Sequence, residues 1–416
     1  MKLLIENIGK IEKAEIEMNG ITVLAGENNT GKSTISKVLY SVFSPLYDCE
    51  NKIDGYIKEA VYKELFYLYR TANYRFSLFR EECTRVLEEI TERYKKEDIS
   101  EEDISLILSD SFLNSNQFVE IDSDLIDDSS KTIMDYLNSD REMVKRLLVQ
   151  TCFEKEFSFQ INNLYKKDSI GNISLIVKDK EINIKIKDNI MTDFSQNINL
   201  LNDVTYLDEP LHFDKYDRSF YSREQVLEHK YDALKKFMEK KEDISIIDDV
   251  IADEKIATVM SLMDDVVGGK VFEEDGELNV NVSGIGDPIH IQNLASGIKS
   301  LLTVKTIIMN GYVKDKGVLI FDEPETHLHP KWQMFLANFI VQLQKEFNTT
   351  CLISTHSPYF LNSIEVFSNK EQISDRCKYY LAEKNHGISD VTFSTERIYK
   401  ILSDTFDDLD AIQDDE

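Results

Sequence analysis

The sequence predicts an α/β protein, in which helices cover a mainly parallel sheet and one long helical segment interrupts the fold. A strand, a glycine-containing loop and a helix follow one another over residues 21–43. Strands and helices alternate again over residues 297–382, as in parallel sheets covered by helices. Between them, residues 48–156 have a helical apolar period. The 416 residues are 42% apolar, which is enough for a sizeable core and two or three folded units.

The N-terminal part combines a hairpin with a buried strand. Residues 2–8 and 13–18 flank a Gly-Lys turn and predict a short antiparallel pair. Ile21–Ala25 is entirely apolar or small and is typical of a buried strand. Helical apolar spacing then predicts a helix over Ser33–Phe43.

The middle of the chain is mainly helical and acidic. Tyr56–Glu97 predicts a long helix rich in aromatic residues, and Met134–Phe153 contains at least one further helix. The acidic stretches 97–103 and 122–128 are expected to be loops.

From residue 157 onwards the elements alternate. The expected strands are Phe157–Leu164, Ile173–Val177, Glu181–Ile186, Val204–Leu207, Val271–Glu273, Leu278–Val282, Val318–Phe321, Cys351–Ser354 and Lys378–Ala382. The expected helices are Ser222–Lys241, Ile244–Val267, Gly297–Met309, Pro330–Phe347 and Pro358–Ile364. The tail 404–416 holds seven acidic residues and no basic one, so we expect it to be mobile.

The loop after the first buried strand matches the phosphate-loop pattern GxxxxGK[ST]. Its glycines let backbone N–H groups surround the phosphates, Lys32 adds a positive charge, and the Ser33 hydroxyl ligates Mg²⁺. The loop also opens a helix, whose N-terminus favours an anion. We therefore expect ATP to contact Gly26, Glu27, Asn28, Asn29, Thr30, Gly31, Lys32, Ser33 and Thr34.

A second chemical motif follows the strand Val318–Phe321, which ends in two carboxylates. Asp322 is expected to hold Mg²⁺ through its water shell. Glu323 is expected to orient or deprotonate the attacking water, as a catalytic residue.

The order of the motifs resembles the ABC-type ATPase heads of the SMC, RecF and OLD families. These motifs are the phosphate loop, a long insertion, a Ser-Gly helix start, an apolar strand ending in Asp-Glu-Pro, and a strand ending in His356. The resemblance implies a P-loop NTPase with a mixed core sheet, an antiparallel β subdomain and a helical insertion. It also implies a homodimer, or a higher even-numbered oligomer, that closes around ATP.

In such heads the signature serine and glycine contact the γ-phosphate bound by the opposite protomer. By resemblance, Ser296 and Gly297 have that role here, and Ser296 is also the expected N-cap of its helix. The usual LSGGQ reads ASGIK in this chain, with Ile298 in place of the second glycine. This departure points away from transporters and towards the OLD-like and RecF-like branch.

The resemblance also gives roles to the histidines. His356 corresponds to the switch histidine that hydrogen-bonds the γ-phosphate, and we count it with Glu323 as catalytic. The segment EPETHLHP resembles the stretch that contributes to the dimer seam in OLD-like ATPases. Structural packing and a metal pair of His327 and His329 are the alternatives.

Other parts of the nucleotide site are less defined. Residues 204–210 resemble the strand and turn that carry the glutamine loop of ABC heads, but no glutamine follows, so the lid of the Mg²⁺ site is unassigned. Lys10 and Lys13 could touch the base or ribose, although an ordinary surface position is favoured.

The resemblance divides the chain into six segments. They are the N-terminal part of the head with the phosphate loop (1–47), a helical insertion (48–156), the β-rich part of the head (157–210), a helical segment (211–267), the C-terminal part of the head (268–403) and an acidic tail (404–416).

Charge and composition restrict the partners. The 76 acidic and 48 basic residues give a net charge of −28, which disfavours binding of nucleic acid or anionic membrane through the whole surface. A local patch is still compatible with nucleic acid, and the arginines interleaved with aromatics in Tyr56–Glu97 are one candidate, although helix packing is favoured there. Apolar runs of only strand length, no signal-peptide pattern and five scattered cysteines predict a cytoplasmic protein without a membrane partner.

We find no nuclease motif after His356, so we expect another chain to perform any cleavage. The chain therefore resembles the stand-alone ATPases of prokaryotic anti-phage systems (Septu-like PtuA, the PARIS ATPase and retron-associated ATPases). This resemblance implies an ATP-hydrolysing sensor or scaffold for a separate effector. A RecF-like DNA-repair ATPase that binds duplex DNA directly is the alternative, and a regulator with negligible hydrolysis is a third.

Overall fold

The computed structural model describes residues 1–72, 76–113, 122–166, 168–208, 227–241, 255–257, 259–261, 263, 269–274, 277–282, 286–384, 387–390, 392 and 394–402. It divides into one unit of residues Met1–Tyr47 and Val149–Glu416 and a second unit of residues Asp48–Leu148. The predicted turn at Glu209 and Pro210, most of the predicted helix Ile244–Val267 and the acidic tail lie outside the described residues. The six segments predicted from the sequence stay a prediction, because this division is coarser.

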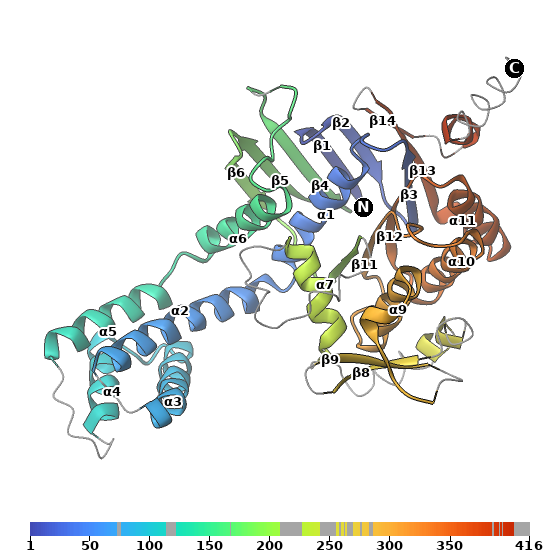
Figure 1. Ribbon diagram of the computed structural model, residues 1–416. Coiled ribbons are helices and arrows are strands. Elements are labelled where there is room, and N and C mark those ends of the chain that lie inside the picture. The colour runs from blue at the N-terminus through green and yellow to red at the C-terminus, as the bar shows by residue number, and fades with distance from the viewer. Residues whose placement is uncertain are drawn as a thin grey trace, which may run out of the picture. The chain divides into compact units, whose positions relative to one another are not determined.

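A six-stranded sheet forms the centre of the first unit (Figure 1). Its strands lie in the order β14 (Ile388–Asp390), β13 (Cys377–Ala382), β3 (Ile21–Gly26), β12 (Thr350–Thr355), β11 (Val318–Asp322) and β7 (Val204–Leu207). All neighbouring pairs are parallel except β13 and β14. The predicted α/β class with a mainly parallel sheet is therefore confirmed.

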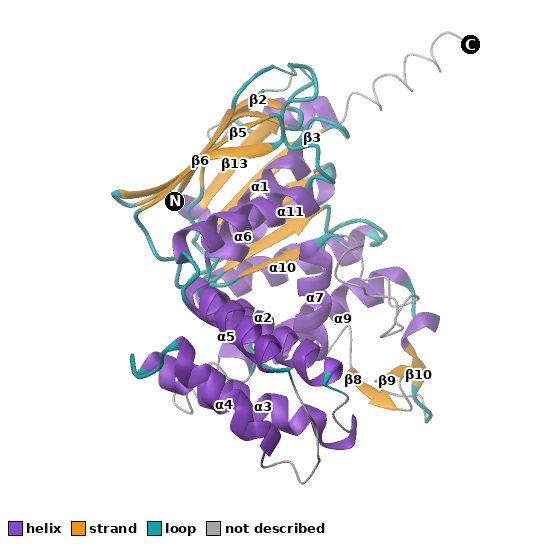
Figure 2. Ribbon diagram, turned by 90° about the vertical axis from the view of Figure 1, so that its left-hand side faces the viewer, coloured by secondary structure: helices purple, strands orange, loops and turns teal. Residues whose placement is uncertain are grey.

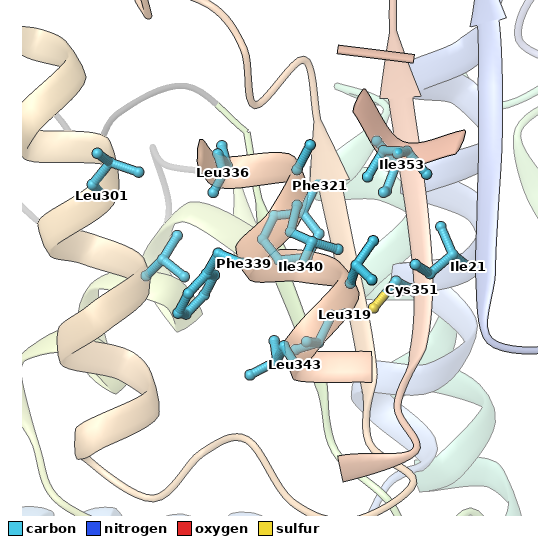
Figure 3. Close-up of a cluster of buried hydrophobic side chains, with 14 of the residues drawn as sticks. Ile21, Leu301, Leu319, Phe321, Leu336, Phe339, Ile340, Leu343, Cys351 and Ile353 are labelled. Atoms are coloured by element: carbon cyan, nitrogen blue, oxygen red, sulfur yellow. The ribbon is translucent and has the colours of Figure 1, made fainter. Parts of the chain in front are cut away.

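Helices cover both faces of this sheet, which explains why its strands are almost continuously apolar. On one face, α9 (Ser296–Met309), α10 (Pro330–Phe347) and α11 (Pro358–Lys370) pack against alternate residues of the strands. Figure 3 shows this core, in which Phe321 and Ile353 meet Phe339 and Ile340 of α10. No helix in the described part of the chain is long and apolar enough to cross a membrane.

The opposite face of the sheet packs on α1 (Lys32–Leu46). Ser354 of β12 lies on this face, since its hydroxyl is 3.2 Å from the hydroxyl of Ser36 in α1. Asp322 is one residue after Phe321 and therefore points to the α1 face. The alternation along β11 thus places this carboxylate beside the helix that follows the phosphate loop.

Two antiparallel sheets complete the unit, as Figure 2 shows. The five-stranded sheet has the order β2 (Ile11–Glu17), β1 (Lys2–Ile8), β4 (Gly171–Val177), β5 (Lys180–Lys187) and β6 (Ile190–Gln196). The three-stranded sheet has the order β10 (Ile289–His290), β9 (Glu277–Val282) and β8 (Gly269–Glu274). Helix α7 (Glu228–Met238) contacts β7, and 3-10 turns occur at Ile291–Asn293 and Ser374–Arg376.

The second unit is helical. It contains α2 (Cys49–Thr71), α3 (Phe76–Lys95), α4 (Glu101–Leu113), α5 (Ser123–Leu137) and the first half of α6 (Arg141–Glu156). A separate apolar cluster holds α2, α3, α4 and α5 together, with Leu65, Leu68, Ile90, Ile104 and Ile133 among its fully buried members. Each of these four helices contributes apolar residues to the cluster, which stabilises the unit.

Several local predictions were wrong. Tyr56–Glu97 is not one helix but parts of α2 and α3, whose described ends are Thr71 and Phe76. The predicted loops 97–103 and 122–128 are helical in part, since α4 begins at Glu101 and Asp122 caps α5 by accepting from the N–H of Asp124. Acidic residues are favourable in a first helical turn, which accounts for this error.

Phe157–Leu164 is not a strand either. Ser158 and Phe159 have positive φ angles, and Asn162 makes only an isolated bridge to Ile8. Of its apolar residues, Ile161 is buried, whereas Phe159 and Leu164 are exposed.

Candidate nucleotide site

The phosphate loop connects β3 to α1, as the sequence predicts. Gly31 precedes α1 with φ of 95°, and no side chain caps the helix, so the first N–H groups of α1 are open to a ligand. A Cβ on Gly26 would lie 2.4 Å from the carbonyl oxygen of Ala382, and one on Gly31 would lie 2.5 Å from Ile11. Only glycine therefore fits both ends of this loop.

The remaining loop residues have distinct settings. Asn28 and Asn29 are exposed, and Asn29 has a φ of 70°. Thr30 is buried and its hydroxyl donates to the carbonyl of Glu27 at 2.9 Å. The N–H of Thr34 donates to the carbonyl of Gly31. The loop thus holds its own shape and leaves its asparagines facing solvent.

Lys32 is buried, with 4% of its surface exposed. Its ammonium donates to the carbonyls of Gly26 at 2.9 Å and Glu27 at 2.8 Å, and lies 4.0 Å from Oε1 of Glu323. Burial lowers the pKa of Lys32, while the carboxylates of Glu323 and Asp322 oppose that effect. The ammonium is therefore held inside the loop, where phosphate oxygens can replace the carbonyls.

Asp322 has one satisfied and one unsatisfied oxygen. Oδ2 accepts a hydrogen bond from the hydroxyl of Tyr206 at 2.8 Å, whereas Oδ1 has no hydrogen-bond partner in the described part of the chain. Burial raises the pKa of Asp322, and the nearby hydroxyls of Tyr206, Ser33 and Ser354 oppose the increase. A buried carboxylate oxygen without a partner costs folding free energy, and such an oxygen is a suitable ligand for a hard cation. Ser33 and Asp322 together fit Mg²⁺.

Glu323 and His356 lie next to each other at the ends of β11 and β12. Oε1 of Glu323 is 3.6 Å from Nδ1 of His356, and the N–H of Glu323 donates to the carbonyl of Ser354 at 2.9 Å. The interaction with His356 lowers the pKa of Glu323 and raises the pKa of His356. Glu323 also has a φ of 51°, a strained backbone conformation typical of functional residues.

Glu325 belongs to the same cluster, although its sequence position did not identify it as a site residue. Only 3% of its surface is exposed, and its Oε1 accepts from the hydroxyl of Thr355 and from the N–H of His356. Oε2 has no partner among the described residues, and burial raises the pKa of Glu325. The signal in the sequence is its position two residues after Glu323, in the run DEPE.

The signature segment differs in one detail from expectation. Ala295, and not Ser296, is the N-cap of α9, because Ser296 already has helical backbone angles. Ser296 is exposed, and no hydrogen bond links its side chain to the phosphate loop of the same chain in the described residues. A Cβ on Gly297 would lie 3.0 Å from the carbonyl of His327 and 2.9 Å from Leu328. The helix start therefore packs closely on the segment after Glu325.

The two histidines of that segment lie at the surface of the protein. His327 and His329 are exposed, and Nδ1 of His329 caps α10 by accepting from the N–H of Lys331. Among the described residues, no group of three or more His, Cys, Asp or Glu side chains is arranged to hold a metal. Lys13 is exposed and lies 3.9 Å from Glu6, which fits a surface position.

A second buried cluster lies behind Asp322 and was not expected from the sequence. The imidazole of His229 is 2.7 Å from Oε2 of Glu156 and 3.0 Å from Oδ2 of Asp208, and it stacks on the ring of Tyr206 at 4.1 Å. Burial favours the neutral imidazole, but the two carboxylates outweigh it and raise the pKa of His229 to about 9. Burial also raises the pKa of Tyr206, so its hydroxyl stays protonated and donates. A single histidine in a charged helix has no pattern that would reveal this cluster.

Several known proteins are similar to this chain. The Retron Vc95 probable ATPase of Vibrio cholerae serotype O1 biovar El Tor is 30% identical over 125 residues, which are 27% of this chain and 23% of that protein. The chain thus matches about a quarter of the length of this curated relative.

Solved structures with a similar course of the chain include two SMC heads. The SMC head domain from Thermotoga maritima has a TM-score of 0.38 at 9% identity and covers 94% of this chain and 97% of that one. The SmcHead bound to the C-winged helix domain of ScpA has a TM-score of 0.42 at 12% identity and covers 95% and 98%.

The match to a protein family extends over most of the chain. Residues 1–361 match the AAA ATPase domain, and this range includes the phosphate loop, Ser296, Asp322, Glu323 and His356. The chain belongs to the AAA ATPase domain family.

Proposed function

We propose that this protein binds ATP with Mg²⁺ at the phosphate loop, hydrolyses it as a homodimer, and uses this cycle to control a separate effector protein. The observation that carries the proposal is the meeting of four groups. The ammonium of Lys32 lies 4.0 Å from Glu323, which lies 3.6 Å from His356. Asp322, whose Oδ1 has no hydrogen-bond partner among the described residues, immediately precedes Glu323.

Each residue has a distinct task in this proposal. The backbone N–H groups of the loop and of α1 bind the phosphates, and Lys32 exchanges the carbonyls of Gly26 and Glu27 for phosphate oxygens. Ser33 and Asp322 would hold Mg²⁺, which would neutralise charge on the phosphates. Glu323 stays ionised because its pKa is lowered, so it can orient the attacking water and accept its proton.

His356 reports on the bound phosphate in this proposal. Its pKa is raised by Glu323, so the imidazole has a protonated form near neutral pH that can donate to a phosphate oxygen. Its backbone is held by Glu325, which connects the end of β12 with the segment after β11. Loss of the phosphate would then change the position of both the end of β12 and the segment after β11.

The second protomer completes the site. Ser296 is exposed at the N-terminus of α9, so its hydroxyl and the adjacent N–H groups can reach a phosphate bound to another protomer. A side chain at Gly297 would crowd this helix start, since its Cβ would lie 3.0 Å from the carbonyl oxygen of His327. ATP would therefore join two protomers, and hydrolysis would release them.

The proposed effector protein and the proposed role in defence are based on the similarity to the retron ATPase. A protein named as the probable ATPase of a retron shares 30% identity with part of this chain, which supports a role beside a second, effector protein in anti-phage defence. The net charge of −28 favours a basic protein surface over bare nucleic acid as the partner.

Glu323→Gln tests the nucleotide and dimer parts of the proposal together. Light scattering during gel filtration should show a dimer that persists with ATP and Mg²⁺, because ATP binds but is not hydrolysed. Lys32→Ala should stay monomeric with ATP, and the exposed Glu181→Gln of β5 should behave as wild type. Equal behaviour of Glu323→Gln and wild type, with no ATP hydrolysis by either protein, would instead support a nucleotide-binding regulator.

The partner is tested separately. Affinity purification from the native host, followed by mass spectrometry, should recover one protein in a fixed ratio with the ATPase. A salt-dependent gel shift of duplex DNA by the purified ATPase, without such a protein, would support the RecF-like alternative.

A further inference from the structure

The hydroxyl of Tyr206 reaches the metal-site carboxylate from the neighbouring strand. Strands β7 and β11 are parallel, and Tyr206 is paired with Ile320, two residues before Asp322. Tyr206 is almost fully buried, and its hydroxyl donates to Oδ2 of Asp322 at 2.8 Å. The other carboxylate oxygen, Oδ1, is left without a partner in the described residues.

Two neighbouring rings pack against the ring of Tyr206. The imidazole of His229 stacks on it with 4.1 Å between the ring centres and 19° between the planes, and the ring of Tyr40 lies 5.8 Å away. His229 is itself held between the carboxylates of Glu156 and Asp208, and its backbone N–H also donates to Glu156. The phenol therefore has little freedom to turn away from Asp322.

We propose that Tyr206 is the positioning residue of the metal site: it occupies Oδ2 of Asp322 and thereby leaves Oδ1 for Mg²⁺ or a water bound to it, while His229 keeps the phenol in place. This inference rests on the proposed nucleotide site and deepens it. A carboxylate with one free oxygen can bind a metal or its water shell in only one orientation. A carboxylate that is not held by a hydrogen bond can rotate between several orientations. Groups behind metal ligands commonly change metal affinity by about 10-fold to 100-fold when they are removed.

Tyr206→Phe tests this inference, because it removes only the hydroxyl and keeps the stacked ring. The probe is Mn²⁺, whose binding to the full-length protein is followed by electron paramagnetic resonance in the presence of a non-hydrolysable ATP analogue. We expect about 10-fold weaker Mn²⁺ binding in the variant. Binding of ADP in EDTA should change less than about twofold, because no metal is involved in it.

Tyr40→Phe is the matched control. It removes a hydroxyl that is also buried, from a tyrosine beside Tyr206, and this hydroxyl makes no hydrogen bond to Asp322. Its Mn²⁺ affinity should equal that of wild type. A double variant with Asp322→Asn adds a second readout, since Tyr206→Phe should cause no further loss once the carboxylate is gone.

The outcomes separate this inference from the function on which it rests. If the wild-type protein binds neither the ATP analogue nor Mn²⁺, the proposed function itself fails. If wild type binds both and Tyr206→Phe binds Mn²⁺ equally well, only the positioning role is overturned. Equal loss of ADP binding in EDTA would also overturn it, because that result means a general collapse of the site. Should Tyr206→Phe not fold, His229→Gln must weaken Mn²⁺ binding, and an unchanged affinity there overturns the inference.

Discussion

The backbone N–H of His356 donates to Oε1 of Glu325 at 3.0 Å, and this contact ties the end of β12 to the segment that follows β11. The same oxygen accepts from the hydroxyl of Thr355. One buried carboxylate therefore holds both residues that end β12, directly beside the proposed catalytic pair of Glu323 and His356. The position of Glu325 near Asp322 and Glu323 in the sequence suggests a catalytic role, but its hydrogen bonds indicate a structural one.

Removal of this carboxylate should destabilise the protein. Glu325→Ala leaves two donors without their acceptor, the buried hydroxyl of Thr355 and the partly buried N–H of His356, which should cost about 2–4 kcal/mol of unfolding free energy. Glu325→Gln keeps an acceptor oxygen at the same place and should cost less. Urea denaturation of both variants measures the difference, and equal stabilities of the two would show that the hydrogen bonds contribute little.

The first glycine of the phosphate loop should not tolerate a side chain. In Gly26→Ala the new Cβ would meet the carbonyl oxygen of Ala382 at 2.4 Å, at a φ of 154° that alanine rarely adopts. We expect complete loss of nucleotide binding by isothermal titration calorimetry and a lower melting temperature. Gly55→Ala is the control, because nothing lies within 4 Å of its Cβ in α2. It should raise stability by about 0.5–1 kcal/mol.

The buried histidine should make stability depend on pH. The pKa of His229 is raised from 6.5 to about 9, so the folded state binds the proton more tightly than the unfolded state. This stabilisation is fully present below pH 6.5 and is lost as the pH rises through 9. At 1.36 kcal/mol per pKa unit, the loss is on the order of 3 kcal/mol at most.

Differential scanning calorimetry between pH 6 and 10 measures this effect. The wild-type melting temperature should decrease across this window, and His229→Gln should show a flatter profile. Glu156, Asp208 and Lys230 also face this site and are unchanged in His229→Gln, so the difference between the two profiles measures the contribution of the histidine. A wild-type profile no steeper than that of the variant would contradict the raised pKa.

Ser296, the exposed serine of the signature, should affect the ATP-dependent association of two protomers but not ATP binding by one protomer. In a Glu323→Gln background, Ser296→Arg should abolish the ATP-dependent dimer while ATP binding by the monomer persists. Because Ser296 is exposed, its replacement should change stability by no more than about 0.5 kcal/mol. Ser195→Arg, at an exposed position of β6, should dimerise normally. Persistent dimers of Ser296→Arg would place the seam elsewhere.

Elements with strong local signals were predictable. Val204–Leu207 and Pro330–Phe347 have the predicted bounds, because a short apolar run and an N-terminal proline mark them directly. Phe157–Leu164 was wrong, because alternation alone cannot distinguish a strand from a turn with two positive φ angles. The N-cap of α9 was wrong by one residue, a position that local sequence rarely determines.

The sequence by itself was sufficient to predict the motifs that consist of consecutive residues. The phosphate loop and the Asp322–Glu323 pair each depend on neighbours along the chain, so their spacing is sufficient to identify them. Only the tertiary structure decided which distant groups surround these motifs. Tyr206 meets Asp322 because two parallel strands share a register, and His229 meets Tyr206 because α7 packs on β7. Such contacts depend on sheet order and helix packing, which no local pattern of residues encodes.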